Sequence, residues 1–187
     1  MERHFDKDLQ ALKDHLIRMG SLVEDALIRA LDCLRSGDRE SATAVIAGDQ
    51  EINSLEIRID DRIIDLLALN QPVASDLRLI LAAQKINNDL ERIGDHAVNL
   101  AESSLVLNTA GLEGSFKMVM SMSETVRRMV RQALDGFIHG DPSLGRAVMN
   151  QDDMIDDLNR KVFADVTGTM KSRPDVIDAG AIRPIGR

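Results

Sequence analysis

The chain has 187 residues, of which 44% are hydrophobic and 29% are charged, so it has enough apolar surface for a packed core. Its 31 acidic residues outnumber the 23 basic ones and leave a formal charge of −8, which argues against a nucleic-acid-binding surface. A single cysteine excludes an intrachain disulfide and a thiolate zinc site, and no uncharged run is long enough to insert into a membrane, so we expect a cytoplasmic protein.

The N-terminal part of the chain has three segments whose apolar residues recur with the three- and four-residue steps of a helix. The first ends at Ser36-Gly37, where glycine favours a helix end and Asp38 can cap the next helix. The second runs from about Arg39 to Leu69 and ends before Pro72, because proline disfavours helix in the residue that precedes it. The third has an apolar seam formed by Leu79, Ala83, Ile86, Leu90, Ile93, Ala97 and Leu100.

Short connections between such long helices force neighbours to be antiparallel, so residues 1–108 are predicted to form a three-helix bundle. A shift of 103 residues then aligns the second half of the chain with the first without a gap. It places Met19 on Met122, Ile52 on Ile155, and the Gly37-Asp38 turn on Gly140-Asp141. The second half is therefore predicted to be a copy of the first.

The predicted copy is incomplete, because Arg187 corresponds to position 84 of the first repeat (187 − 103). Residues 112–171 would form two helices without a third, and residues 172–187, with two prolines and two glycines, an irregular tail. The sequence thus predicts an all-α fold of tandem three-helix bundles whose second bundle lacks its third helix. An oligomer partner or a swapped element would cover the open face, and a truncated or frameshifted reading frame explains it equally well.

Carboxylates form a second stripe on the third helix, where Glu91 and Asp95 lie one turn apart and could bind one hard cation. Glu56 and Asp60 have the same spacing on the second helix and could supply the facing half of such a site. The chain has six acidic pairs at this spacing, where roughly five are expected by chance, so the spacing alone favours a solvated face. No Glu-x-x-His, HExxH, GxSxG or phosphate-binding loop motif is present, which argues against an oxidase or a hydrolase.

The stretch from residue 71 to residue 102 resembles the signature segment of the PhoU family of phosphate-signalling regulators. The matching residues are Gln71-Pro72, Asp76-Leu77-Arg78, Asp89-Leu90-Glu91-Arg92-Ile93-Gly94-Asp95, Asn99 and Glu102. The resemblance implies a tandem of three-helix bundles, a cytoplasmic and often dimeric protein, and multinuclear metal clusters held by acidic pairs. The metal would be Fe or Zn, with Mn or Mg as alternatives.

Carried onto this chain, the resemblance points to Glu91, Asp95, Glu56 and Asp60 as metal ligands. In the second repeat, Asn159 and Phe163 stand where Glu56 and Asp60 stand in the first. That leaves a weaker set of possible ligands, formed by Asp153, Asp157 and Asn99. Arg78 and Arg92 are predicted to contribute to partner binding.

The function implied by the resemblance is regulation rather than catalysis. A PhoU-like protein would restrain phosphate uptake and the phosphate-starvation response by contacting the ATPase of the phosphate ABC transporter and the sensor histidine kinase. Two alternatives remain open from the residues alone. One is a metalloenzyme whose metal is bound by carboxylates, and the other is a purely structural helical interaction module.

Overall fold

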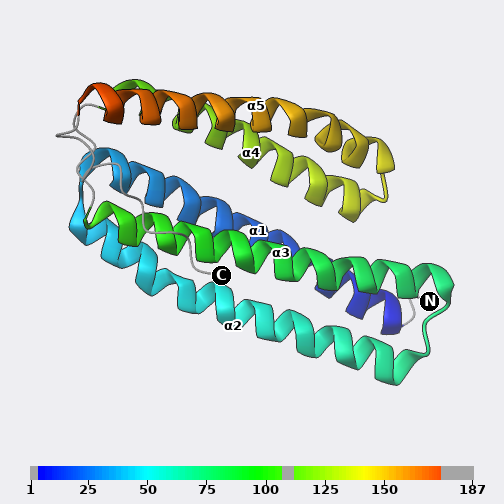
Figure 1. Cartoon of the computed structure of the whole chain (residues 1–187). Helices are drawn as coiled ribbons and strands as arrows, with labels where there is room; N and C mark the ends of the chain where they lie inside the picture. The colour runs from blue at the N-terminus through cyan, green and yellow to red at the C-terminus, as the bar shows by residue number, and fades with distance from the viewer. Residues whose placement is uncertain (1–3, 107–111, 174–187) are drawn as a thin grey trace.

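The computed structural model describes residues 4–106 and 112–173, which form five α-helices and no strand (Figure 1). The helices are α1 (His4–Ser36), α2 (Arg39–Asn70), α3 (Ala74–Ser104), α4 (Glu113–His139) and α5 (Pro142–Ser172). The all-α prediction is confirmed, with three helices in the first repeat and two in the second. Helix α3 ends at Ser104, four residues before the predicted boundary at residue 108. Nearly all of the predicted tail, residues 174–187, lies outside the described residues.

The turn shared by the two repeats has the same construction in both. Gly37 and Gly140 adopt left-handed backbone conformations, with φ of 69° and 67°. Asp38 accepts hydrogen bonds from the backbone N–H of Glu40 and Ser41, at 3.0 and 3.2 Å, and thereby caps α2. Asp141 caps α5 in the same way by accepting from Ser143 N–H at 2.8 Å. The predicted glycine-aspartate turns are therefore confirmed.

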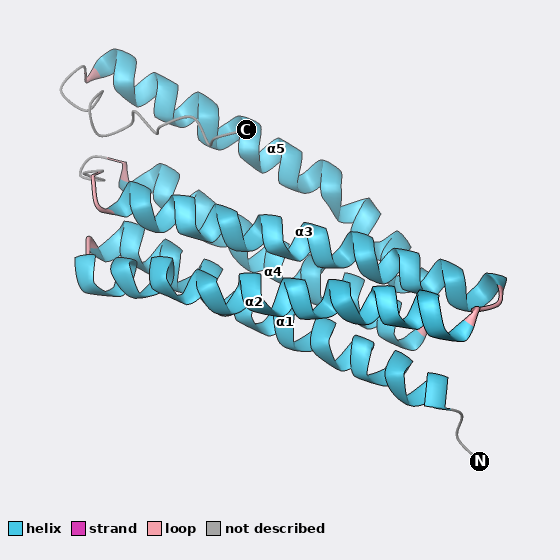
Figure 2. Ribbon diagram, turned by 90° about the horizontal axis from the view of Figure 1, so that it is seen from below, coloured by secondary structure: helices cyan, strands magenta, loops and turns pink. Residues whose placement is uncertain are grey.

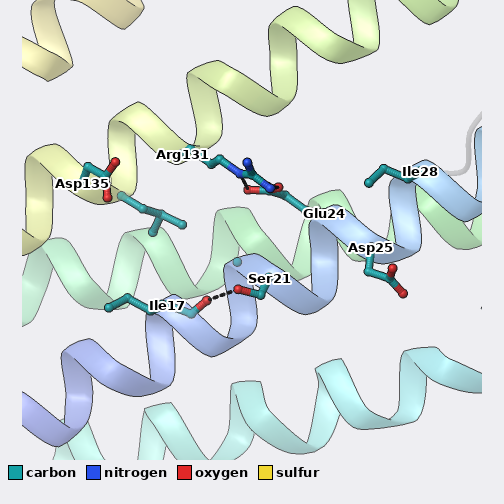
Figure 3. A pocket seen from close by; sticks show the side chains of 9 residues that line it. Ile17, Ser21, Glu24, Asp25, Ile28, Arg131 and Asp135 are labelled. Carbon is teal, nitrogen blue, oxygen red and sulfur yellow. Dashed lines mark hydrogen bonds and ion pairs between the residues drawn. The ribbon is translucent and has the colours of Figure 1, made fainter.

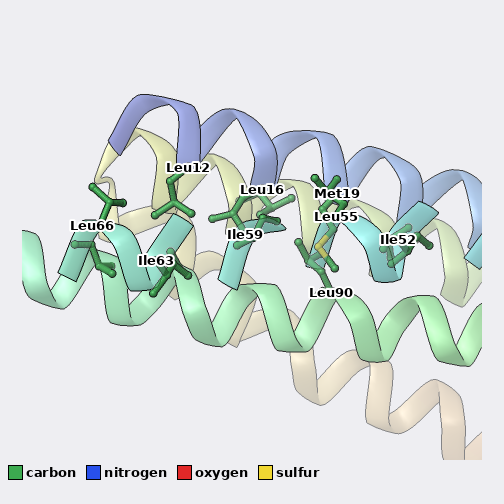
Figure 4. Packing of buried hydrophobic residues seen from close by; sticks show 13 residues of the cluster. Leu12, Leu16, Met19, Ile52, Leu55, Ile59, Ile63, Leu66 and Leu90 are labelled. Carbon is green, nitrogen blue, oxygen red and sulfur yellow. The ribbon is translucent and has the colours of Figure 1, made fainter. Parts of the chain in front are cut away.

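Helices α1, α2 and α3 enclose the main core. Leucine and isoleucine side chains from all three helices interdigitate along its length; Figure 4 shows Leu12, Leu16, Met19, Ile52, Leu55, Ile59, Ile63, Leu66 and Leu90. A second cluster consists mostly of small residues, namely Ala30, Cys33, Ala42, Val45, Ala97 and Ala101. Burial of this apolar surface is the main source of stability for the bundle.

The inward face of α3 is rotated relative to the predicted seam. Leu79, Ile86 and Ile93 are only half-buried. The fully enclosed positions are Ile80, Ala83, Asn87, Leu90, Gly94, Ala97 and Ala101. Small side chains on this face allow α3 to approach α2 closely: a Cβ on Gly94 would lie 3.2 Å from Ile52 Cδ1. Of the predicted seam, Ala83, Leu90 and Ala97 are buried, and Ile86 and Ile93 are partly buried and pack against the core.

Helices α4 and α5 form an antiparallel hairpin on one side of the three-helix bundle (Figures 1 and 2). Among the described helices, α4 contacts α1 and α5, whereas α5 contacts α4 alone. No residue of α5 is buried, and its apolar side chains Met149 and Phe163 are 75% and 74% exposed. The structure therefore shows a second repeat without a third helix over the described residues, while the division of the chain into two domains at residues 109–111 stays a prediction. No described helix has the length and apolar character needed to cross a membrane.

Candidate functional site

The predicted carboxylates on α2 and α3 lie on adjacent surfaces of the two antiparallel helices. Asp60 Oδ1 accepts hydrogen bonds from Gln84 Nε2 at 2.8 Å and from Asn87 Nδ2 at 2.7 Å. Asn87 Nδ2 also donates to the backbone carbonyl of Glu56 at 3.1 Å. These contacts fix the register of the two helices and place Glu56 close enough to Glu91 to affect its ionisation.

Mutual repulsion and burial act together on this group of carboxylates. Burial raises the pKa of Glu91, and the neighbouring charges of Asp95 and Glu56 raise it further. Burial, followed by the charge of Asp60, raises the pKa of Glu56. Burial also raises the pKa of Asp49, which lies about two helical turns before Glu56 on α2, and the charge of Asp95 raises this pKa further. The acidic cluster therefore contains Asp49 in addition to the four predicted residues, and its charged form is disfavoured.

The donor chemistry of the acidic cluster suits a hard cation, because carboxylate and amide oxygens are the ligands that such cations prefer. Asp49 Oδ1 and Asn87 Oδ1 are both buried without a hydrogen-bond partner, so two oxygen acceptors are available beside the carboxylates. Over residues 4–106 and 112–173, however, no three His, Cys, Asp or Glu side chains converge as a metal-binding group. The residues therefore fit a cation by composition and position, whereas the side chains as placed do not enclose one.

Asn87 is a site residue that the sequence analysis missed. Its side chain is fully buried, although asparagine is usually exposed. Asn87 lies seven residues before Gly94 and three before Leu90, on the stripe of α3 that faces the core. This position in the sequence was the signal that could have indicated its burial. Its amide links α3 to α2 by donating to the Asp60 carboxylate and to the backbone carbonyl of Glu56.

The remaining predicted residues lie outside the acidic cluster or at its edge. Arg92 is exposed and pairs with Asp89, at 3.8 Å, rather than with Glu91 or Asp95, and Arg78 is exposed near the start of α3. Asn99 is half-buried near the end of α3. On α5, Asp153 and Asp157 are exposed, and Asp157 pairs with Arg160.

The second repeat does not reproduce the acidic cluster. Asn159 and Phe163, which correspond to Glu56 and Asp60, lie exposed on α5. Phe163 has no helix over it in the described part of the chain, whereas Asp60 is bonded to side chains of α3. The two halves thus share turns and apolar positions but differ in charge at this site.

A second feature, which the sequence analysis also missed, is a cleft of about 430 Å³ between α1 and α4 (Figure 3). Beside it, the buried Glu24 carboxylate accepts two hydrogen bonds from Arg131 Nε, at 2.8 and 2.7 Å, and pairs with Arg127 at 3.9 Å. Gly20 lies directly against Leu134. These contacts attach the α4–α5 hairpin to the first three helices.

The family model for the PhoU domain matches residues 16–104 and 119–183. A phosphate-specific transport system accessory protein PhoU homolog from Aquifex aeolicus is 39% identical over 81% of this chain and 69% of its own length. A homolog with the same name from Clostridium acetobutylicum is 33% identical over 89% of this chain and 76% of its own length.

Solved structures give the same result. The crystal structure of PhoU from Pseudomonas aeruginosa matches with a TM-score of 0.86 and 32% identity, over 95% of this chain and 85% of that one. The phosphate transport system regulatory protein PhoU from Streptococcus pneumoniae matches with a TM-score of 0.85 and 29% identity, over 95% of this chain and 83% of that one. The resemblance seen in residues 71–102 is thereby confirmed, and the chain belongs to the PhoU family.

Proposed function

We propose that this chain regulates phosphate uptake and phosphate-starvation signalling through protein–protein contact rather than catalysis. The observation that carries the proposal is family membership, supported by relatives whose names describe phosphate transport accessory or regulatory proteins. The rigid helical fold with an acidic cluster on its surface suits a role in docking. The chain would act in the cytoplasm as a homodimer and as a negative regulator, contacting the ATPase of the phosphate ABC transporter and the sensor histidine kinase.

A reporter assay tests the regulatory role. The chain is expressed in a bacterium that lacks its own PhoU and carries a phosphate-starvation promoter fused to a reporter gene. We expect the reporter signal in phosphate-rich medium to fall when the chain is present. An unchanged signal, with folded chain detected in the cells, would contradict the role. Light scattering of the purified chain tests the homodimer.

We further propose that Glu56, Asp60, Glu91 and Asp95 hold a multinuclear metal cluster of Fe or Zn, with Mn or Mg as alternatives. A bound cluster would supply the positive charge that offsets repulsion among these carboxylates and would tie α2 to α3. The raised pKa of Glu91 and the unpartnered oxygens of the acidic cluster support this proposal.

Metal analysis of protein purified without chelators tests the cluster. The double variant E91A/D95A should lose bound metal, whereas D153A/D157A on α5 should retain it and serves as the matched control. If the wild type binds no metal above background, the metal proposal fails while the regulatory role stands. A chain without a metal role would instead gain stability in E91A/D95A, by about 0.2–0.5 kcal/mol, because one repulsive pair is removed.

A further inference from the structure

A second cleft, of about 430 Å³, lies between α1 and α2, which run antiparallel beside each other in the three-helix bundle (Figure 1). None of its residues belongs to the acidic cluster or to the cleft between α1 and α4. Leu66 and Leu69 supply apolar surface, and most of the other side chains that line it are charged. Small-molecule sites have volumes of about 300–1,000 Å³. The cleft is therefore large enough for a small ligand.

Two guanidinium groups lie on the α2 side of this cleft. Arg58 is exposed and forms no hydrogen bond or ion pair within residues 4–106 and 112–173. Arg62 is half-buried, and its Nη1 donates to Asp8 Oδ1 at 3.3 Å, so part of this guanidinium group is still free. The two arginines are four residues apart, so they face the same side of α2, where like charges repel each other. An anion between them would relieve this repulsion and accept hydrogen bonds from their free N–H groups.

The α1 side of the cleft contains the half-buried imidazole of His15. Burial lowers the pKa of His15, so the ring is neutral at pH 7. Three guanidinium groups lower this pKa further, those of Arg62, Arg58 and Arg18, whereas the Asp14 carboxylate opposes them with the smallest effect. The part of the cleft beside His15 is therefore a region of positive charge that the ring itself does not create.

Three aspartates also line the cleft and limit how tightly it can bind an anion. Asp8 is engaged by its ion pair with Arg62. Asp61 and Asp65 are exposed one turn apart on α2 and form no ion pair in the described part of the chain. Neither of these two is among the charges that act on His15. The negative charge thus weakens an anion site in this cleft without reversing the positive charge beside the ring.

We propose that the cleft between α1 and α2 binds a small oxyanion, held by the guanidinium groups of Arg58 and Arg62 beside His15. A guanidinium group can donate two parallel hydrogen bonds to the oxygens of a phosphate, a sulfate or a carboxylate, whereas a halide ion has one centre and cannot accept them in this way. The inference does not depend on the proposed function, because this site needs neither a metal nor a partner protein.

Nuclear magnetic resonance of the full chain, with 15N-labelled histidine, tests the site. Sodium phosphate, sodium sulfate and sodium acetate are titrated separately at pH 7, with sodium chloride added to keep the ionic strength constant. We expect at least one oxyanion to shift the ring signals of His15 with a saturable dependence. The other three histidines report non-specific effects. A response to phosphate and sulfate alone would assign the site to tetrahedral oxyanions, and a response to acetate alone to carboxylates.

The pKa of His15 gives a second measurement. A bound anion stabilises the protonated imidazole, so the pKa of His15 should rise when the oxyanion is present, because the neighbouring charged side chains described above stay the same. Chloride at the same ionic strength should leave this pKa unchanged.

Variants that remove positive charge locate the site. R58Q/R62Q should raise the Kd by about tenfold or more. R58Q alone should also raise it, and this variant leaves the ion pair between Arg62 and Asp8 intact. R160Q/K161Q removes the same amount of charge from the exposed surface of α5 and should leave the Kd unchanged. Circular dichroism of each variant confirms that the helices are intact.

A variant that removes negative charge gives the opposite result. D61N/D65N should lower the Kd, because two carboxylates no longer oppose the anion. The inference is overturned if no oxyanion shifts the His15 signals, if chloride shifts them equally, or if R160Q/K161Q weakens binding as much as R58Q/R62Q does. Weaker binding in D61N/D65N would also overturn it. None of these outcomes bears on the reporter assay, so the regulatory role stands or falls separately.

Discussion

The contact between α1 and α4 allows a sharp test of how the hairpin is attached. Gly20 lies in the middle of α1, and a Cβ at this position would be 2.4 Å from Leu134 Cδ1 and 3.9 Å from Leu134 Cγ. Replacing Gly20 with Ala should gain about 0.5–1 kcal/mol from helix propensity. Overpacking against a buried side chain costs about 1–3 kcal/mol. Since the adjoining cleft gives Leu134 some room to move, we expect a net loss of about 1 kcal/mol.

Urea unfolding followed by circular dichroism measures this loss, and two further variants isolate its cause. Gly48→Ala is the matched control, because a Cβ there meets no atom within 4 Å, so it should stabilise the chain by about 0.5–1 kcal/mol. In a Leu134→Ala background the clashing Cδ1 is gone, so Gly20→Ala should become stabilising. If Gly20→Ala stabilises the otherwise unchanged chain as much as Gly48→Ala does, the close packing of α1 against α4 is refuted.

Three further predictions concern charged side chains. Glu24→Gln weakens the ion pair between Glu24 and Arg131, so backbone hydrogen exchange in α4 and α5 should accelerate while exchange in α2 stays the same. Equal acceleration in all helices would contradict this prediction. In the chain depleted of metal, Glu91→Gln should raise the Tm at pH 7, because burial and neighbouring charges raise the pKa of Glu91 and the ionised carboxylate therefore destabilises the fold. The gain should vanish near pH 4, below the ordinary pKa of 4.5, and a gain that persists there would refute this account. Asp38→Ala should lower the Tm at pH 7, because hydrogen bonds from Ser41 stabilise the Asp38 carboxylate and lower its pKa. The contribution of Asp38 to stability is full above pH 3.8 and is lost as the pH falls through its lowered pKa in the folded chain, so thermal melts at pH 7 and pH 3 check the difference.

Much of the fold could be predicted because its signals are local. The Gly37-Asp38 turn and the Pro72 that follows α2 determine where helices end, and these residues act through their own backbone chemistry. The rotation of α3 could not be predicted in the same way. It depends on how closely Gly94 approaches Ile52, which is a property of two helices and not of one periodic pattern.

The candidate site shows the same division. The spacing of Glu91 and Asp95 did not stand out from chance, whereas the family motif around them pointed to carboxylates on α2 and α3, which the structure places side by side. Neither signal included Asn87, which could be found only from its place on the inward stripe of α3. Glu24 was equally hidden, since its role depends on an arginine 107 residues later in the chain.

The arrangement of contacts also has a mechanical consequence. Helix α5 contacts only α4 among the described helices, and α4 contacts the first bundle only through α1. Within the described residues, α5, α4 and the bundle of α1–α3 are therefore joined in series, and the helices offer no second route between α5 and α2 or α3. A displacement of α5 can reach α2 and α3 through these helices only by way of the α1–α4 junction, where Gly20 packs against Leu134.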